Sequence, residues 1–412
     1  MSTRRICIIT PNHLSRNPRV VKEAEALAAA GHDVHVVHGR YEPTYDGFDR
    51  AMTLPFGTTV VPWGPFMAPR GTYLRQGIAH RLSKYVSKLR PLLGPLAVHA
   101  AAPAAPDLMK VVRDVSADLY IAHYVAALPA AAEAAARHGA IYAFDAEDFH
   151  LGDLPDAPEH RHANAIIREI EGRYLPGAAY VTAGSPGIAD AYAKAYGIET
   201  PHTILNVFPT GQAPAEWTPR GATPHPSVYW FSQTIGADRG LEQAIEAIAI
   251  ARTEPHLYLR GTPASGYLEE LMAFAGTNGV ADRVHVLPPD EPERMVRLAT
   301  EYDVGLVAET GRTRNHRIML SNKQFTFILA GVPLLMSDIP SHREFAAQAG
   351  HAARLFRIED PSTLAAGMDA LLQRGDALSE ARQQAFRLGQ TRYNWELEGA
   401  KLIDIVEEAL NG

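Results

Sequence analysis

Polar residues that directly follow apolar, β-branched runs are the first candidates for chemistry in this sequence. In an open parallel sheet, ligands bind beyond the carboxyl ends of the strands, so a site is expected at these positions. In the first half of the chain they are Asn12, His13, Arg16, His123, Asp145, Glu147, Asp148 and His150. In the second half they are Gln233, Thr234, Arg260, Gly261, Glu309 and Asn315. The two sets predict a cleft rich in His, Arg, Asn and carboxylates.

A glycine-bearing loop with an arginine is the first candidate site for a phosphate. It reads Ser232-Gln-Thr-Ile-Gly236-Ala-Asp-Arg239-Gly240 and precedes an expected helix. Backbone N–H groups, the helix dipole and the Arg239 guanidinium could converge there on a diphosphate. The alternative is that Arg239 is a surface charge and the glycines only turn the chain.

Asn322 and Lys323 form a second candidate, at the start of an expected helix over 322–330. Asn322 is suited to cap that helix. A lysine in the first turn opposes the helix dipole, and an anionic ligand would resolve the conflict. The alternative is a solvated lysine.

Alternating strand and helix patterns position these residues. Residues 4–38 read as a strand, a helix that begins at Asn17-Pro18, and a second strand, which requires a parallel pair. Further strands are expected at 118–123, 141–145, 180–183, 202–207, 227–231, 256–260, 284–287, 303–308 and 333–338. Helices are expected at 128–138, 163–174, 188–196, 241–252 and 322–330, and throughout 361–410. Two doubly wound α/β domains follow from this pattern.

A proline-rich stretch separates the two halves. Residues 209–226 contain five prolines and two glycines, which cannot sustain a core element. We therefore expect an N-terminal domain over 1–208, a linker over 209–226 and a C-terminal domain over 227–390.

Composition limits the function classes. The 412 residues carry a net charge of −7, which disfavours nucleic-acid binding. The single cysteine, Cys7, can form no disulfide within the chain and fits a reducing compartment. The N-terminus lacks the pattern of a signal peptide and no run of 18 apolar residues occurs, so a cytoplasmic protein without a membrane span is predicted. No dinucleotide-binding or P-loop glycine motif is present, which disfavours nicotinamide dehydrogenases and P-loop NTPases.

Several segments together resemble retaining glycosyltransferases of family 4. The resemblance covers roughly 1–40, 118–210 and 227–410. Its motifs are the Asn17-Pro-Arg-Val-Val opening with Gly31-His32, the strand ending in His123, the acidic loop Asp145–Asp148, the turn Leu205-Asn206-Val207, Arg239-Gly-Leu-Glu242, Asn322-Lys323 through Gly331-Val-Pro333, and Tyr393-Asn-Trp395-Glu396. The last motif begins what looks like the family's closing helix, about 391–412, which crosses back onto the first domain.

The resemblance implies the GT-B architecture, in which two Rossmann-like doubly wound domains face each other across a cleft. The first domain would be the acceptor side and the second the donor side. The implied reaction moves a sugar from a nucleotide diphosphate sugar to an acceptor nucleophile with retention, without a metal or another cofactor. Carried over by position, Arg239 would hold the diphosphate, and Lys323 would support it or the neighbouring loop. His123 would contact the donor sugar or help to organise the reacting oxygens. His13 and Arg16 would line the cleft floor, and Asp145, Glu147 and Asp148 are candidate acceptor-side bases.

Some positions depart from the family pattern. Ile318 and Thr326 stand where the family usually has a pair of glutamates, of which the second contacts the ribose, and Glu309 is a candidate substitute. Gln233 or Thr234 replaces the first basic residue of the family's usual pair. Two alternatives therefore stay open: a nucleotide-sugar epimerase with the GT-B fold, and a non-catalytic sugar-nucleotide-binding relative. The acceptor could be a small molecule, a glycan or a lipid-linked molecule.

A basic stretch suggests a second kind of contact. Residues 51–106 contain no acidic residue and six basic ones, Arg70, Arg75, Arg81, Lys84, Lys88 and Arg90. Leu74, Ile78, Leu82, Tyr85, Val86 and Leu89 interleave at helical spacing, which is typical of a helix that contacts a membrane surface or an anionic acceptor. The alternative is a helix packed on the first domain. A zinc site of His13, His123 and His150 and a Ser185 hydrolase are disfavoured, because their spacing matches neither motif.

Overall fold

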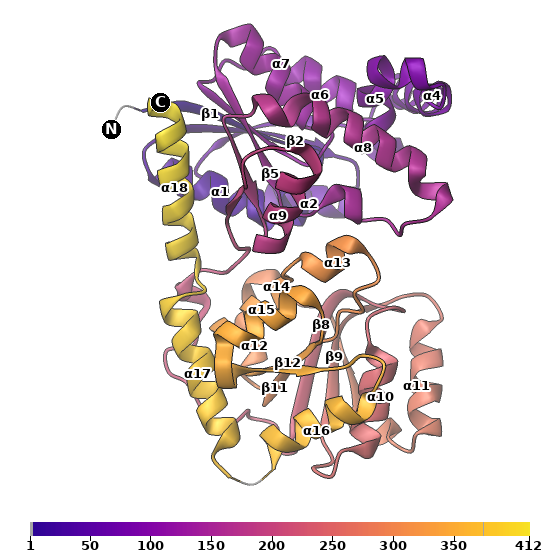
Figure 1. Ribbon diagram of the computed structural model, residues 1–412, viewed down its shortest axis with the longest axis vertical. Helices are drawn as coiled ribbons and strands as arrows, with labels where there is room; N and C mark the ends of the chain where they lie inside the picture. The colour runs from indigo at the N-terminus through magenta and orange to yellow at the C-terminus, as the bar shows by residue number, and fades with distance from the viewer. Residues whose placement is uncertain (1–2, 374) are drawn as a thin grey trace. The chain divides into compact units, whose positions relative to one another are not determined.

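The structure, a computed structural model, describes residues 3–373 and 375–412 (Figure 1). The chain divides into two compact units. The first comprises the residues up to Ile204 together with Thr313–Asn315 and Gly399–Gly412. The second comprises Leu205–Arg312 and His316–Glu398.

The first unit contains a seven-stranded sheet of order β3-β2-β1-β4-β5-β6-β7. Its strands are β1 (Arg5–Thr10), β2 (Asp33–Arg40), β3 (Gly57–Pro62), β4 (Leu119–His123), β5 (Ile141–Ala146), β6 (Tyr180–Ala183) and β7 (His202–Thr203). Every neighbouring pair is parallel, so the carboxyl ends of the strands share one edge. β1 to β3 extend the sheet one way and β4 to β7 the other, as a doubly wound sheet requires.

Helices cover this sheet (Figure 1). They are α1 (Pro18–Ala29), α2 (Pro43–Ala51), α3 (Gly64–Met67), α4 (Arg70–Val86), α5 (Leu93–Ala101), α6 (Ala105–Val112), α7 (Leu128–His138), α8 (Arg161–Tyr174) and α9 (Pro186–Tyr196). Side chains cap two of these helices: the Asn17 side chain accepts from Val20 N at the start of α1, and the Ser185 hydroxyl accepts from Ile188 N at the start of α9. These caps satisfy backbone donors that the first turn leaves free.

The second unit contains a six-stranded parallel sheet of order β10-β9-β8-β11-β12-β13. Its strands are β8 (Ser227–Ile235), β9 (His256–Pro263), β10 (Val284–Leu287), β11 (Val304–Val307), β12 (Leu334–Ser337) and β13 (Ala353–Phe356). Its helices are α10 (Leu241–Ile250), α11 (Tyr267–Thr277), α12 (Met295–Ala299), α14 (Asn322–Leu329), α15 (Pro340–Ala349), α16 (Pro361–Leu372) and α17 (Ala377–Thr391), while α13 (Arg314–Ile318) and α18 (Trp395–Asn411) have residues in both units.

Each unit has its own apolar core. The β1 residues Ile6 to Ile9 are at most 1% exposed in the first unit. In the second unit, two clusters of buried side chains are centred on Trp230 and on Phe327. Buried parallel strands with helices beside them explain the near-continuous apolar runs of the sequence.

Several sequence-based expectations are wrong in detail. The strand expected at 202–207 is only β7, and the continuous helix expected over 361–410 is three helices, α16, α17 and α18. β8 and β9 extend through Ile235 and Pro263, so Ser232–Thr234 and Gly261–Thr262 lie within strands rather than after them. The cap of α14 is Ser321, because Asn322 already belongs to the helix. The edge strands β3 and β13 were not expected, since their half-exposed sequences lack a strong apolar run.

Candidate functional site

Three side chains at the carboxyl edge of the first sheet lie in one row. His123 ends β4 and pairs in register with Asp145 of β5, which pairs with Thr182 of β6. The Thr182 hydroxyl donates to Asp145 Oδ1 at 2.5 Å, and His123 Nδ1 lies 3.2 Å from Asp145 Oδ2. The parallel register therefore joins residues that the sequence separates by a helix each.

Two charged residues of α1 complete this cluster. Arg19 donates two hydrogen bonds to Asp145, from Nε to Oδ2 and from Nη2 to Oδ1, and both are 2.7 Å long. One turn further along α1, Glu23 Oε2 accepts from His123 Nε2 at 2.5 Å. Arg19, Glu23, His123 and Asp145 are all 3% exposed or less. A buried charge network of this kind fixes the position of each member, because every charge has a partner.

The network shifts the pKa of His123 and of Asp145 strongly. Burial lowers the pKa of His123, but the carboxylates of Glu23 and Asp145 outweigh that effect and raise it to about 10. Burial likewise raises the pKa of Asp145, yet the Arg19 guanidinium and His123 hold it well below its usual range. His123 is therefore an imidazolium at neutral pH.

The pKa values of two neighbouring groups, Lys22 and Glu147, are shifted in the opposite direction, toward their neutral forms. Burial lowers the pKa of Lys22 to about 7, and the nearby positive charge of Arg19 adds to the effect. Burial raises the pKa of Glu147. Ionisable groups with strongly shifted pKa values are typical of functional sites.

The backbone around this edge is tightly constrained. Tyr124, directly after His123, has a φ of +69°, which side chains other than glycine seldom adopt. A Cβ on Gly184, directly after β6, would lie 2.4 Å from Glu147 O. Glycine thus allows the acidic loop after β5 to approach β6 closely, and strain of the Tyr124 kind occurs often at functional sites.

The His150 side chain is held by a carboxylate behind the loop. His150 Nδ1 lies 2.8 Å from Glu171 Oε1 and 2.7 Å from the Tyr192 hydroxyl, and both Tyr192 and Tyr196 donate to Glu171. Burial lowers the pKa of His150, but the hydrogen bond to Glu171 outweighs it and raises the pKa. The four side chains fix the start of the segment after the acidic loop.

The loop after β1 holds Asn12, His13 and Arg16. His13 is fully buried: Nδ1 lies 2.7 Å from Asp49 Oδ2, and Nε2 accepts from the backbone N–H groups of Tyr41 and Glu42. Nε2 therefore carries no proton. Asn12 is half-buried and Arg16 is exposed, with Arg16 Nη1 donating to the Tyr45 hydroxyl at 2.9 Å.

In the second unit, the loop before α10 contains two residues with positive φ angles. Asp238 has a φ of +61°, and Gly240, the N-cap of α10, has a φ of +69°. A Cβ on Gly240 would lie 2.7 Å from Ala308 Cβ, so this loop packs against the segment after β11. Arg312 of that segment pairs with Asp238. The half-buried Arg239 has no hydrogen bond or ion pair to another described residue.

Lys323 in the first turn of α14 already has an anionic partner. Its Nζ donates to Glu309 Oε1 at 2.8 Å and lies 5.9 Å from the centre of the Trp230 ring. Burial raises the pKa of Glu309, but Lys323 outweighs it and lowers the pKa to about 2. An internal carboxylate thus resolves the conflict between Lys323 and the helix dipole. Thr326 is buried and its hydroxyl donates to Asn322 O, so it stays within its own helix.

The remaining candidates have various surroundings. Gln233 and Thr234 are exposed at the end of β8, beside a register shift between Phe231 and Thr234. Arg260 donates a hydrogen bond from Nε to the Tyr229 hydroxyl at 2.8 Å and another from Nη1 to Pro288 O at 3.0 Å. A Cβ on Gly261 would lie 2.3 Å from Ser232 O. The Asn206 side chain is buried in the segment that follows β7.

Asn315 groups with the first unit. Its side chain accepts from Phe149 N at 2.9 Å and donates to Asp148 Oδ1 at 2.8 Å. The amide therefore meets the acidic loop with both of its polar atoms.

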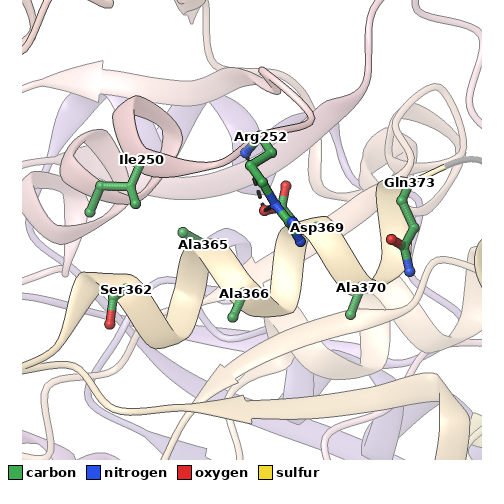
Figure 2. Close-up of a pocket in the computed structure, with 8 residues that line it drawn as sticks. All are labelled: Ile250, Arg252, Ser362, Ala365, Ala366, Asp369, Ala370 and Gln373. Atoms are coloured by element: carbon green, nitrogen blue, oxygen red, sulfur yellow. Dashed lines mark hydrogen bonds and ion pairs between the residues drawn. The ribbon is translucent and has the colours of Figure 1, made fainter.

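A groove of about 410 Å³ lies away from these edges, between α10 and α16 (Figure 2). Asp369 is its central charge, and it accepts from Arg252 Nε and from the backbone N–H groups of Arg252 and Thr253. These bonds tie the end of α10 to α16, so the carboxylate has a structural role.

The part of the chain that the structure describes contains neither a candidate metal site nor a candidate membrane span. Within residues 3–373 and 375–412, no three or more His, Cys, Asp or Glu side chains are grouped so that they could hold a metal ion. In the same residues, every helix is too short or too polar to cross a membrane.

The family of the first domain is shown by comparison with known proteins. Residues 17–209 match the family model described as a glycosyl transferase 4-like domain. This segment is a glycosyl transferase 4-like domain. The resemblance to glycosyltransferase family 4 is thereby confirmed, and the row of His123, Asp145 and Thr182 belongs to this domain. No curated protein matches the sequence at a significant level.

Solved structures with the same fold extend over the whole chain. HepE from Anabaena in complex with UDP and glucose aligns with a TM-score of 0.71 at 14% identity, covering 98% of this chain and 100% of that one. Sucrose-phosphate synthase from Thermosynechococcus elongatus gives 0.73 at 15% identity and 98% of both chains. A glycosyltransferase from Rickettsia africae gives 0.65 at 12% identity, with 100% and 99% covered. Residues 17–209 thus lie mainly in the first of two Rossmann-like domains, and the chain as a whole has the GT-B fold of these structures.

Sequence reasoning missed Arg19, Glu23 and Glu171 as members of these clusters. A signal was present for the α1 pair, because Arg19 and Glu23 flank the apolar positions Val20 and Val21 of the buried face. Charged residues are rarely buried without a partner. A charge pair on the apolar side of a helix therefore predicts partners on the sheet beneath it.

Proposed function

We propose that this protein transfers a sugar from a nucleotide diphosphate sugar to an acceptor nucleophile with retention of configuration and without a metal. The glycosyl transferase 4-like domain supports the transferase class. Neighbouring structures with bound UDP and UDP-glucose support a uridine nucleotide as the first donor to test.

The observation that carries the proposal is Arg239. It is a half-buried cation without a partner among the described residues, between two residues in the left-handed region and directly before α10. The start of α10 has free backbone N–H groups and the positive end of the helix dipole. A diphosphate placed there would receive charge-assisted bonds from Arg239 and backbone bonds from the helix.

The chemistry follows from this placement. In the transfer, the bond between the anomeric carbon and a diphosphate oxygen breaks, the acceptor oxygen forms the new glycosidic bond, and the acceptor's proton passes to the departing diphosphate. Negative charge grows on that diphosphate, so Arg239 stabilises the transition state. Lys323 contributes through its pair with Glu309, which sets the position of both side chains beside Trp230.

In the first unit, His123 would act as a fixed positive charge toward the donor sugar or its diphosphate, because it is an imidazolium held by Glu23 and Asp145. Asp148, Glu147 and Asn12 supply polar groups for the acceptor. A cytoplasmic location belongs to the same proposal, while a peripheral membrane contact through residues 70–90 is a separate one.

Arg239→Ala tests the donor site. Loss of one charge-assisted contact should weaken UDP binding by about 1.5–3 kcal/mol, or roughly 10- to 150-fold. Isothermal titration calorimetry with UDP measures this effect, and Arg297→Ala, an exposed arginine of α12 in the same unit, is the matched control. Unchanged UDP affinity in Arg239→Ala, with measurable affinity in the wild type, would exclude this site.

A non-catalytic relative is the second candidate, and the buried Thr326 favours it, because no carboxylate stands at that position of α14. Turnover separates the candidates. Release of nucleoside diphosphate that depends on an acceptor supports transfer, whereas a new nucleotide sugar formed from the donor alone indicates an epimerase. Binding without either product indicates the non-catalytic relative.

A further inference from the structure

The helix α4 presents its apolar side chains outward. Leu74, Ile78, Leu82 and Tyr85 are 59%, 65%, 60% and 72% exposed, and Leu89, just after the helix, is 62% exposed. They follow one another at steps of three or four residues, so they form one continuous ridge along the helix. Phe66 of the neighbouring α3 is 69% exposed.

The opposite side of α4 is polar and buried. Gln76, Ser83 and Ser87 are at most 7% exposed. Gln76 Nε2 donates to Asp107 Oδ2 at 2.7 Å, and the Ser87 hydroxyl lies 3.2 Å from His162 Nε2. These contacts fix the rotation of the helix at the edge of the first unit, beside α5 (Figure 1). A surface helix ordinarily buries its apolar face, whereas α4 packs by its polar face and exposes its apolar one.

A basic strip lies beside the apolar ridge. Arg70, Arg81, Lys84 and Lys88 are exposed, and none has an ion-pair partner among the described residues. Arg75 is different, because it pairs with Asp107 at 2.7 Å. The Arg90 side chain lies outside the described residues. The strip is a local concentration of positive charge in a chain whose net charge is −7.

We propose that the α4 ridge and its basic strip bind the surface of an anionic lipid bilayer. The ridge would enter the interface between headgroups and acyl chains, while the strip would meet the phosphates of anionic lipids. An exposed apolar ridge of this size is unfavourable in water unless it has a partner.

A bilayer fits this surface better than a second copy of the chain does. In a two-fold dimer each ridge would face its own equivalent, which would bring two identical basic strips together without acidic residues to separate them. The nearest stretch of sequence supplies no acidic residue, because residues 51–106 contain none. The membrane contact does not rest on the proposed donor site, which lies in the second unit.

Co-sedimentation of the full chain with vesicles tests the proposal. We expect binding to vesicles of phosphatidylcholine and phosphatidylglycerol, weaker binding to phosphatidylcholine alone, and loss of binding as salt is added. Ile78→Ser with Leu82→Ser should reduce the partition coefficient by about tenfold or more, and Lys84→Glu with Lys88→Glu should do the same. Ile250→Ser and Arg137→Glu, exposed residues of α10 and α7, are the matched controls and should bind as the wild type does.

Three results would overturn the proposal. The wild type could fail to bind phosphatidylglycerol vesicles at low salt, or the ridge and strip variants could bind as tightly as their controls. Sedimentation could also show a dimer that the ridge variants convert to a monomer, which would assign the ridge to a second copy. UDP affinity, measured without vesicles, should be unchanged in every ridge variant, so failure of the donor site and failure of the membrane contact give different results.

Discussion

At the scale of single residues, His123 shows how two carboxylates decide the state of one side chain. Burial alone would keep this imidazole neutral, but Glu23 at 2.5 Å and Asp145 at 3.2 Å hold it protonated. Its folded-state pKa of about 10 lies above the unfolded value of about 6.5. The stability that His123 contributes through its two carboxylate partners is therefore fully present below about pH 6.5. It is lost as the pH rises through about 10.

Glu23→Gln tests this linkage. The substitution removes one partner of a buried pair, so it should lower the free energy of unfolding by about 3 kcal/mol near pH 6. The difference from the wild type should shrink between about pH 7 and pH 10, as the wild-type imidazolium loses its proton. Chemical denaturation across this range measures it, and Glu25→Gln, an exposed residue of the same helix, is the control. A difference that stays constant with pH would show that His123 is not charged in the folded protein.

At the scale of elements, α14 combines a satisfied charge with an unsatisfied amide. Lys323 has Glu309, yet Gln324 is 0% exposed and neither its Nε2 nor its Oε1 has a partner among the described residues. Its neighbours Phe325 and Phe327 are core residues of the second unit. Burying an amide without hydrogen bonds costs free energy.

Gln324→Met should therefore stabilise the protein. Methionine has a similar volume and no group that needs a hydrogen bond, so the free energy of unfolding should rise by about 1–2 kcal/mol. Urea denaturation measures the change, with Gln383→Met on the exposed side of α17 as the control. Destabilisation by Gln324→Met alone would indicate that a bound water or ligand satisfies this amide.

At the scale of the whole molecule, each unit has its own sheet and core, so the two should unfold as separate cooperative units. The proposed diphosphate site lies entirely in the second unit. A ligand that binds only the folded state raises the stability of the unit that binds it.

Calorimetry should show two transitions, and UDP should raise the temperature of only one of them. At a concentration about 100 times its Kd, UDP should add about 2.7 kcal/mol to the stability of the second unit. Arg239→Ala should reduce this stabilisation to about 0.3–1.4 kcal/mol at the same UDP concentration and leave the other transition unchanged. A UDP shift that is as large in Arg239→Ala as in the wild type, or that moves both transitions together, would contradict this assignment.

The sequence by itself determined the local elements and the class of fold. Apolar strand runs, caps such as Asn17 and Ser185, and one-helix connections depend on residues close together in the chain, and they predict two parallel sheets. The glycines and Arg239 before α10 also form a local pattern, and its assignment as a phosphate site stays a prediction. The edge strands β3 and β13 were missed because their sequences lack a strong apolar run. The breaks between α16, α17 and α18 were missed because all three segments share helical periodicity.

Only the tertiary structure decided which charges meet and which faces are covered. Arg19 and Asp145 are 126 positions apart, and their pair depends on the register of three parallel strands beneath α1. Lys323 finds Glu309 rather than solvent because the first turn of α14 lies beside the segment that directly follows β11. The periodicity of α4 predicts an amphipathic helix, but the hydrogen bonds of Gln76 and Ser87 turn its apolar side outward. Periodicity fixes which residues share a face, whereas packing against the rest of the unit fixes the direction in which that face points.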